Sequence, residues 1–269
     1  MLELELVMKK MLLLITLLIS FNLYASDLLN NVIIISIDAL HPDAVTAENA
    51  PNIFKAAKTG VIKLNGKSTN PPKTLISHSA MFTGLTPQNG GRKSNAWHKG
   101  DVNIKQRTIF NIAKELGYNT GYIYSKGKLE FLKNGTIDYS TFSKEYPIER
   151  TNAYVNIHDK NFVFLHISGL DITGPLYGWL SKEYIEDFNF IDEELQVLIE
   201  TVTKKEKYLL IITSDHAGHD RAHGCNHPDD YKLPFIAVSD VLDVKSKLVD
   251  HYETYMLTDY LKSVGVFKN

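Results

Sequence analysis

Carboxylates stand directly after, or close behind, three apolar stretches of this sequence. The β-branched run 32–37 ends in Asp38, the run 162–167 leads into Asp171, and the run 208–213 is followed by Asp215 and His216. A buried carboxylate is costly unless it is paired or metal-bound, and zinc and related divalent ions accept carboxylate and imidazole ligands. Each Asp alone could instead cap a following helix. Together they predict a metal centre.

The segment 214–224 concentrates histidines and aspartates immediately after the third apolar run. It contains His216, His219 and His223, together with two aspartates and glycines that allow tight backbone turns. We interpret His223 as a further metal ligand. The competing interpretation is a plain exposed polar loop, because His219 or His223 alone could be an ordinary surface residue.

A hydroxyl at Thr74 comes just before an apolar stretch that is compatible with a helix. Free backbone N–H groups at a helix N-terminus favour a phosphate group. Threonine is a weak nucleophile, but a bound cation can activate it. The segment therefore predicts that Thr74 attacks a phosphate ester, with a helix-capping threonine as the alternative.

Strand-like and helix-like segments alternate along the chain. Apolar strands are expected at 32–37, 120–124, 162–167 and 208–213, helices at 109–116 and 181–203, and a small excursion from the sheet at 126–156. This order predicts an α/β fold with a mostly parallel central sheet and helices on both faces. Ligands of such sheets bind at the carboxyl ends of the strands, so the acidic residues and histidines should converge there.

Composition fits one large globular domain. The chain has 269 residues, 44% of them apolar, and a formal net charge of −2. A core of good size is therefore expected. Without a basic field the chain is not expected to bind duplex nucleic acid.

The first residues have the pattern of an export signal. Lys9 and Lys10 precede the apolar residues 11–19, and small residues follow at Ala25 and Ser26. We expect a signal peptide at 1–25, a mature domain at 26–269, a periplasmic or secreted location, and no stable membrane span after removal of the signal; a retained anchor is the alternative. Cys225 is the only cysteine, so no intramolecular disulfide can form.

Taken in order, these motifs resemble the type I phosphodiesterase/nucleotide pyrophosphatase branch of the alkaline-phosphatase superfamily. The matching positions are Asp38, residues 50–53, the Thr74 segment with 83–87, residues 108–118, Asp171 and residues 214–216. The resemblance implies an alkaline-phosphatase-like fold and a phosphoric ester hydrolase with a phosphothreonine intermediate and a small phosphate-ester substrate. It also implies two divalent metal ions, zinc being preferred. One would be held by Asp38, Thr74, Asp215 and His216, and the other by Asp171, His223 and one more histidine.

The sequence departs from the family pattern at Pro175. The pattern Asp-x-x-x-His begins at Asp171 and should end in a histidine, but position 175 is proline and offers no ligand. Either His219 or His227 replaces it, or the second site is weak and completed by water. A third interpretation is a binding protein that has lost turnover.

The same resemblance assigns further contacts to the substrate. Asn95 would donate to a phosphate oxygen and take part in catalysis, Lys126 and Lys128 would face the substrate, and His78 would be structural. A turn asparagine and solvated surface lysines are the alternatives. A phosphomonoesterase or a sulfatase-like relative is the second functional hypothesis, although a sulfatase would usually carry Cys or Ser at the position of Thr74.

Overall fold

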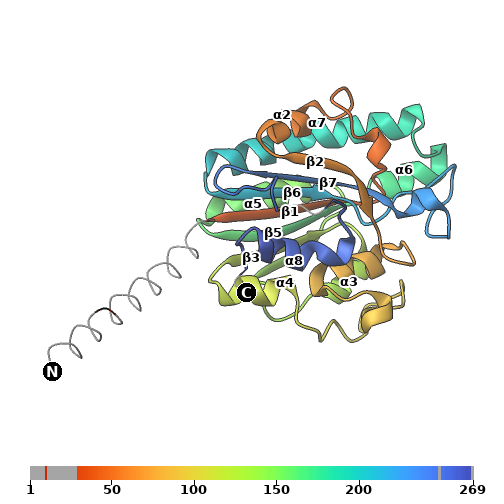
Figure 1. The fold of residues 1–269 in the computed structure, drawn as a ribbon. Helices are drawn as coiled ribbons and strands as arrows, with labels where there is room; N and C mark the ends of the chain where they lie inside the picture. The colour runs from red at the N-terminus through yellow and green to blue at the C-terminus, as the bar shows by residue number, and fades with distance from the viewer. Residues whose placement is uncertain (1–9, 11–28, 248–249, 268–269) are drawn as a thin grey trace.

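The computed structural model describes Lys10, residues 29–247 and residues 250–267; apart from Lys10, the expected signal peptide lies outside this part of the chain. Its centre is a seven-stranded sheet with the strand order β2-β7-β6-β1-β5-β3-β4 (Figure 1). The strands are β1 (Asn31–Ile37), β2 (Val61–Lys67), β3 (Asn119–Tyr124), β4 (Tyr139–Phe142), β5 (Asn161–Ile167), β6 (Tyr208–Thr213) and β7 (Lys232–Ser239).

The middle of the sheet is parallel and buried on both faces. β1 pairs in parallel with β5 on one side and with β6 on the other. Along β1, Val32 and Ile34 pack into one hydrophobic cluster, whereas Ile33, Ile35 and Ile37 pack into a second cluster across the sheet. This two-sided burial explains why the strand is a continuous apolar run instead of an alternating one. The four strands expected from the sequence are all confirmed.

The outer strands were not expected. β7 runs antiparallel to β6, β2 runs antiparallel to β7, and β4 adds a parallel strand to β3 at the other edge. β4 lies within 126–156, together with a helix that packs on the sheet. The expectation that this segment leaves the sheet is therefore wrong, because its polar, half-buried residues form an edge strand.

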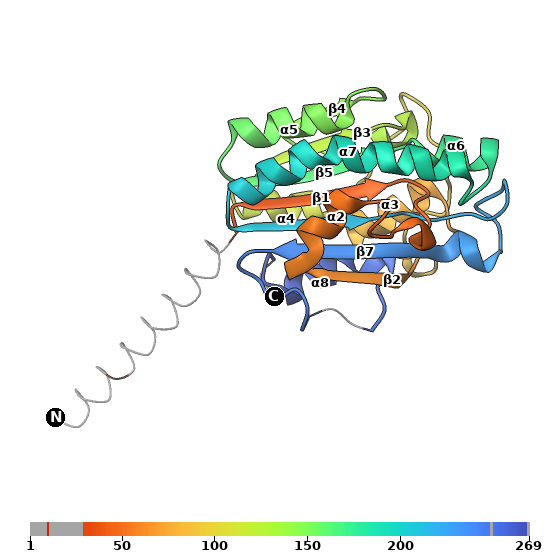
Figure 2. The same cartoon turned by 90° about the horizontal axis from the view of Figure 1, so that it is seen from above.

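Helices cover both faces, as expected for the fold class (Figures 1 and 2). One cluster of apolar side chains joins the sheet to α2, α5, α6 and α7, and the other joins it to α3, α4 and α8. The helices are α2 (Pro51–Ala56), α3 (Thr74–Thr83), α4 (Ile109–Glu115), α5 (Pro147–Ile157), α6 (Leu170–Tyr177), α7 (Lys182–Lys204) and α8 (Leu257–Ser263). Short 3₁₀ helices are η1 (Pro42–Ala44), η2 (Ala57–Thr59), η3 (Pro87–Asn89), η4 (Gly127–Leu132), η5 (Pro228–Tyr231) and η6 (Thr254–Met256).

The two helices expected from the sequence are confirmed as α4 and α7. Ser181 caps α7, because its side chain accepts a hydrogen bond from the backbone N–H of Tyr184. Within the described residues, no helix combines the length and the apolar character that crossing a membrane would require.

Candidate metal centre and active site

Residues from distant parts of the chain meet at the carboxyl edge of the sheet. Asp38 follows β1, Asp215 and His216 follow β6, and Asp171 lies in the first turn of α6, after β5. α6 and α3 lie at this end of the sheet on opposite faces (Figure 1). The convergence expected for parallel strands is therefore present.

Several buried side-chain atoms at this edge that could bind a metal have no hydrogen-bond partner within the described part of the chain. Those around β1 and β6 are Asp38 Oδ1, Asp215 Oδ2 and His216 Nε2, and all three residues are fully buried. Donor atoms of these residues lie within 4.8 Å of one another. His216 Nδ1 lies 2.9 Å from the backbone oxygen of Ala217, to which it must donate, so in the neutral ring the free lone pair is on Nε2. Since unsatisfied buried acceptors are rare, this donor set fits a divalent cation.

Thr74 is the first residue of α3, where the sequence analysis expected a nucleophile. Its Oγ1 lies 3.2 Å from Lys126 Nζ. Asn95 lies beside the same helix start, because its Oδ1 accepts a hydrogen bond of 2.9 Å from the Leu75 backbone N–H. That bond uses the amide oxygen of Asn95 and leaves its NH₂ group to donate elsewhere.

His78 links α3 to the sheet and holds Thr74 in place. Its Nδ1 lies 2.7 Å from the Thr74 backbone oxygen and 3.6 Å from Asp215 Oδ2, and its Nε2 lies 2.9 Å from Ser36 Oγ. The carbonyl can only accept, so Nδ1 donates and Nε2 accepts from the serine hydroxyl. Burial lowers the pKa of His78 to about 4. The structural role expected for this histidine fits these contacts.

Lys126 lies among the carboxylates and is only 16% exposed. Its Nζ is 2.6 Å from Asp38 Oδ2 and 2.5 Å from Asp171 Oδ2, in addition to its contact with Thr74. Burial lowers the pKa of Lys126, but the charges of Asp38, Asp171 and Asp215 outweigh it and hold the pKa above its ordinary value. Lys126 is therefore a permanent cation within the site. Lys128, half-buried nearby, has a lowered pKa because of burial and the charge of Lys126.

His166 on β5 is a site residue that the sequence analysis missed. Its Nδ1 accepts from the Ser125 backbone N–H at 3.3 Å, so Nε2 carries the proton and donates to Asp38 Oδ2 at 2.9 Å. Burial alone would raise the pKa of Asp38, yet Lys126 and His166 outweigh it and hold the pKa well below its ordinary value. A histidine inside an otherwise apolar buried strand was the available signal.

Asp171, His216 and His223 form a second group of possible ligands within 4.8 Å. His223 Nε2 lies 3.4 Å from Asp171 Oδ1, and the rings of His216 and His223 stack with centroids 4.8 Å apart. His216 belongs to both groups, but its one free lone pair can bind only one ion. A second ion would then be left with Asp171 and His223.

Neither histidine considered as a replacement for the ligand missing at Pro175 belongs to this group. His219 Nδ1 lies 2.7 Å from Asp230 Oδ1, and its ring stacks on His227 with centroids 3.8 Å apart. Both side chains are thus engaged elsewhere. The weak second site therefore stays a prediction.

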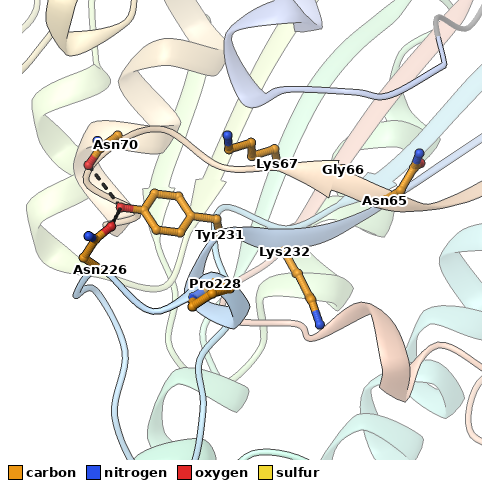
Figure 3. A pocket seen from close by; sticks show the side chains of 8 residues that line it. All are labelled: Asn65, Gly66, Lys67, Asn70, Asn226, Pro228, Tyr231 and Lys232. Atoms are coloured by element: carbon orange, nitrogen blue, oxygen red, sulfur yellow. Dashed lines mark hydrogen bonds between the residues drawn. The ribbon is translucent and has the colours of Figure 1, made fainter.

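A separate cavity of about 480 Å³ lies beside the loop that carries His223 (Figure 3). Tyr231 Oη lies 3.1 Å from both Asn70 Oδ1 and Asn226 Oδ1, which joins this loop to the segment before Thr74. The side chains lining it include Lys67 and Lys232 but none of the expected site residues.

Solved structures with the same fold include enzymes of several kinds. A 2-O GAG sulfatase superimposes with a TM-score of 0.68 at 15% identity, over 89% of this chain and 71% of that one. The zinc complex of the C-terminal periplasmic domain of EcEptC from Escherichia coli gives 0.66 at 13% identity, over 88% and 82%. Murine ectonucleotide pyrophosphatase/phosphodiesterase 5 gives 0.64 at 13%, over 88% and 95%. These likenesses confirm the alkaline-phosphatase-like fold.

Curated relatives are much longer proteins. GPI ethanolamine phosphate transferase 1 of Emericella nidulans is 38% identical over 82 residues, which are 29% of this chain and 9% of that protein. The enzyme of the same name from Chaetomium globosum is 31% identical over 176 residues, 59% of this chain and 19% of that protein. The chain thus spans less than one fifth of the length of either relative.

The family can be assigned from a match over most of the chain. The relatives are enzymes, and the zinc complex among the structural neighbours agrees with divalent metal binding in this fold. The nucleotide pyrophosphatase branch itself stays a prediction. Residues 30–255 match the sulfatase family model, so the chain belongs to the sulfatase family, within the alkaline-phosphatase superfamily.

Proposed function

We propose that this protein is a metal-dependent phosphodiesterase that uses Thr74 as its nucleophile and passes through a phosphothreonine intermediate. One observation carries the proposal: the Thr74 hydroxyl and the Asp38 carboxylate share the Lys126 ammonium, beside buried ligand atoms that have no hydrogen-bond partner among the described residues. A nucleophile at a helix start next to an unsatisfied ligand set suits phosphoryl transfer.

Asp38, Thr74, Asp215 and His216 would hold a divalent ion, zinc being preferred for this mixed oxygen and nitrogen set. When bound, the ion would supply Lewis acidity that lowers the pKa of the threonine hydroxyl and offsets phosphate charge. A second ion would bind more weakly, at Asp171 and His223. Lys126 would supply positive charge to that half of the site, because its ammonium already contacts Asp171.

The protein's own residues would orient the reaction. His78 holds the Thr74 backbone and thereby aims the side chain, while the NH₂ group of Asn95 donates to a phosphate oxygen beside the helix start. The threonine hydroxyl loses its proton and its oxygen forms a bond to phosphorus as the bond to the leaving oxygen breaks; the leaving group takes up a proton and departs as an alcohol. Water then attacks phosphorus and releases Thr74. Lys126 and Lys128 would offset the charge of the bound phosphate.

A transferase is the second candidate, in which an alcohol instead of water accepts the phosphoryl group. The names of the relatives favour it, since several are GPI ethanolamine phosphate transferases. Phosphomonoester or sulfate ester hydrolysis, or binding without turnover, are further alternatives. Position 74 is threonine, where a dedicated sulfatase would usually carry Cys or Ser, and this argues against a dedicated sulfatase.

We also propose that the protein is exported to the periplasm or secreted, where a small phosphate ester would be its substrate and duplex nucleic acid would not be a partner. The signal pattern at 1–25 and the net charge of −2 support this. Fractionation of cells that produce the full chain, with mass measurement of its N-terminus, tests the location.

Activity on chromogenic substrates tests the reaction class. The protein, loaded in turn with zinc, manganese and magnesium, should cleave bis(p-nitrophenyl) phosphate faster than p-nitrophenyl phosphate or p-nitrophenyl sulfate. Thr74→Ala should lower kcat by about 10³-fold or more, while Thr74→Ser keeps a hydroxyl and should retain part of the activity. Unchanged turnover in Thr74→Ala would disprove the nucleophile assignment, and faster sulfate release would reverse the order of the alternatives.

Product analysis distinguishes the hydrolase from the transferase. With ethanolamine or glycerol present, a hydrolase releases p-nitrophenol and p-nitrophenyl phosphate as its only products, whereas a transferase releases p-nitrophenol and also forms a mixed diester with the added alcohol. Intact-mass measurement during turnover should show a nitrophenyl phosphate adduct on the protein, and the adduct should be absent from Thr74→Ala.

A further inference from the structure

The loop between β6 and β7 carries another cluster of metal-ligating side chains. His219, Cys225 and Asp230 offer one imidazole nitrogen, one sulfur and one carboxylate oxygen that lie within 4.8 Å of one another. None of these residues belongs to the candidate metal centre. The mechanism proposed above gives them no role.

Asp230 is the fixed centre of this cluster. It is fully buried, its backbone oxygen accepts from the Ala217 N–H at 3.1 Å, and its own N–H donates to the His227 oxygen at 3.1 Å. Its two carboxylate oxygens point to different partners, Oδ1 to His219 Nδ1 at 2.7 Å and Oδ2 to the Cys225 N–H at 2.8 Å. A buried carboxylate held in this way pays little ordering entropy on binding a cation.

His219 is also held in place before any ion binds. Its backbone forms a two-bond bridge with Ala222, and its ring lies against that of His227 at an interplanar angle of 18°. The imidazole therefore keeps its position beside Asp230. Cys225 is exposed at the rim, so an ion has access from solvent.

We propose that His219, Cys225 and Asp230 form a further site for a divalent ion. This site is structural in role and selective for zinc-like ions. Nitrogen and thiolate ligands favour zinc over magnesium or calcium, and water completes four-coordination on the exposed side. On binding, the Cys225 thiol proton leaves to solvent and the thiolate bonds to the ion. The hydrogen bond between His219 Nδ1 and Asp230 Oδ1 is replaced by bonds to the ion, and the ring proton of His219 moves from Nδ1 to Nε2.

The site would order the loop that supplies catalytic ligands. His216 and His223 lie on the same loop, on either side of His219. The loop is also tied to the start of the α7 region, because the Trp179 N–H donates to the Asp220 oxygen at 2.8 Å. An ion held between the two ends of the loop would therefore fix the position of His223 relative to Asp171.

The single cysteine makes the test specific. The candidate catalytic centre has only oxygen and nitrogen donors, so a thiolate-to-cobalt charge-transfer absorption in the Co²⁺-loaded protein can come only from Cys225. The wild type should show this near-ultraviolet absorption. Cys225→Ser should lose it, whereas Asp171→Asn, which alters the other group of ligands, should keep it. No such absorption in the wild type, or its loss in Asp171→Asn, would overturn the proposal.

Labelling of the thiol provides an independent measurement. At a free zinc concentration ten times the dissociation constant, reaction of Cys225 with a disulfide reagent should slow about tenfold, because only the unbound thiol reacts. His219→Gln, a substitution on a partly exposed side chain, should abolish this protection. Equal labelling rates with zinc and with a chelator, or full protection in His219→Gln, would contradict a site built from these residues.

Discussion

Pro175→His restores a donor where the second ligand group is incomplete. Asp171 and position 175 are four residues apart in α6 (Leu170–Tyr177), so their side chains project from the same face of the helix. A histidine there would lie beside Asp171 and could join His223 around an ion. Proline also lacks the backbone N–H that would donate a helical hydrogen bond to the backbone carbonyl oxygen of Asp171. Replacing it therefore changes the helix as well as the ligand set.

The size of the ligand effect can be estimated. Loss of an outer-shell partner costs about 10–100-fold in metal affinity, so a restored direct ligand at position 175 should gain at least about tenfold, or about 1.4 kcal/mol. With metal in excess, the same amount is added to the free energy of unfolding. For a domain of this size it corresponds to a rise in Tm of about 3–6 °C.

The assay compares Pro175→His with Pro175→Ala, each in chelator and in excess zinc. Both variants regain the backbone N–H, so any rise in Tm in the presence of chelator measures the effect of the substitution on the stability of the helix. Only Pro175→His should show the additional rise in Tm with zinc, together with a higher metal content by mass spectrometry and faster diester cleavage. Equal zinc-dependent shifts in the two variants would refute the assignment of position 175 to the second metal site.

Three further predictions concern the surroundings of the centre. His166→Asn should weaken metal binding about 10–100-fold in competition with a chelator, because Asp38 loses its imidazole donor; unchanged affinity would contradict this role. Asn95→Ala should lower kcat/KM about 10²–10³-fold. Asn95→Asp keeps an acceptor for the Leu75 N–H but removes the donor, so it should be similarly impaired. Wild-type activity in the aspartate variant would exclude donation to phosphate. The folded-state pKa of His78 lies below its ordinary value, at about 4, so the folded protein binds fewer protons than the unfolded chain. The free energy of unfolding in chelator should therefore fall by about 3 kcal/mol as pH drops from about 6.5 to about 4, and this component should be missing in His78→Gln.

The sequence alone was sufficient for the central strands. β1, β3, β5 and β6 are recognisable because parallel strands covered on both faces must be apolar at nearly every position. The edge strands β2 and β4 are half exposed, with mixed polarity, and no local pattern separates them from loops. Their place depends on a neighbouring strand that offers backbone donors and acceptors. Only the assembled sheet supplies that neighbour.

The candidate site also has a part that the sequence determined and a part that only the tertiary structure decided. The sequence determined that Asp38, Asp171 and Asp215 end up together, because each follows a strand and parallel strands end at one edge. Only the tertiary structure decided that Lys126 lies between two of these carboxylates and that His166 donates to one of them. Such contacts depend on side-chain direction across adjacent strands and loops, where electrostatic attraction selects the partner, and spacing along the chain carries no record of that choice.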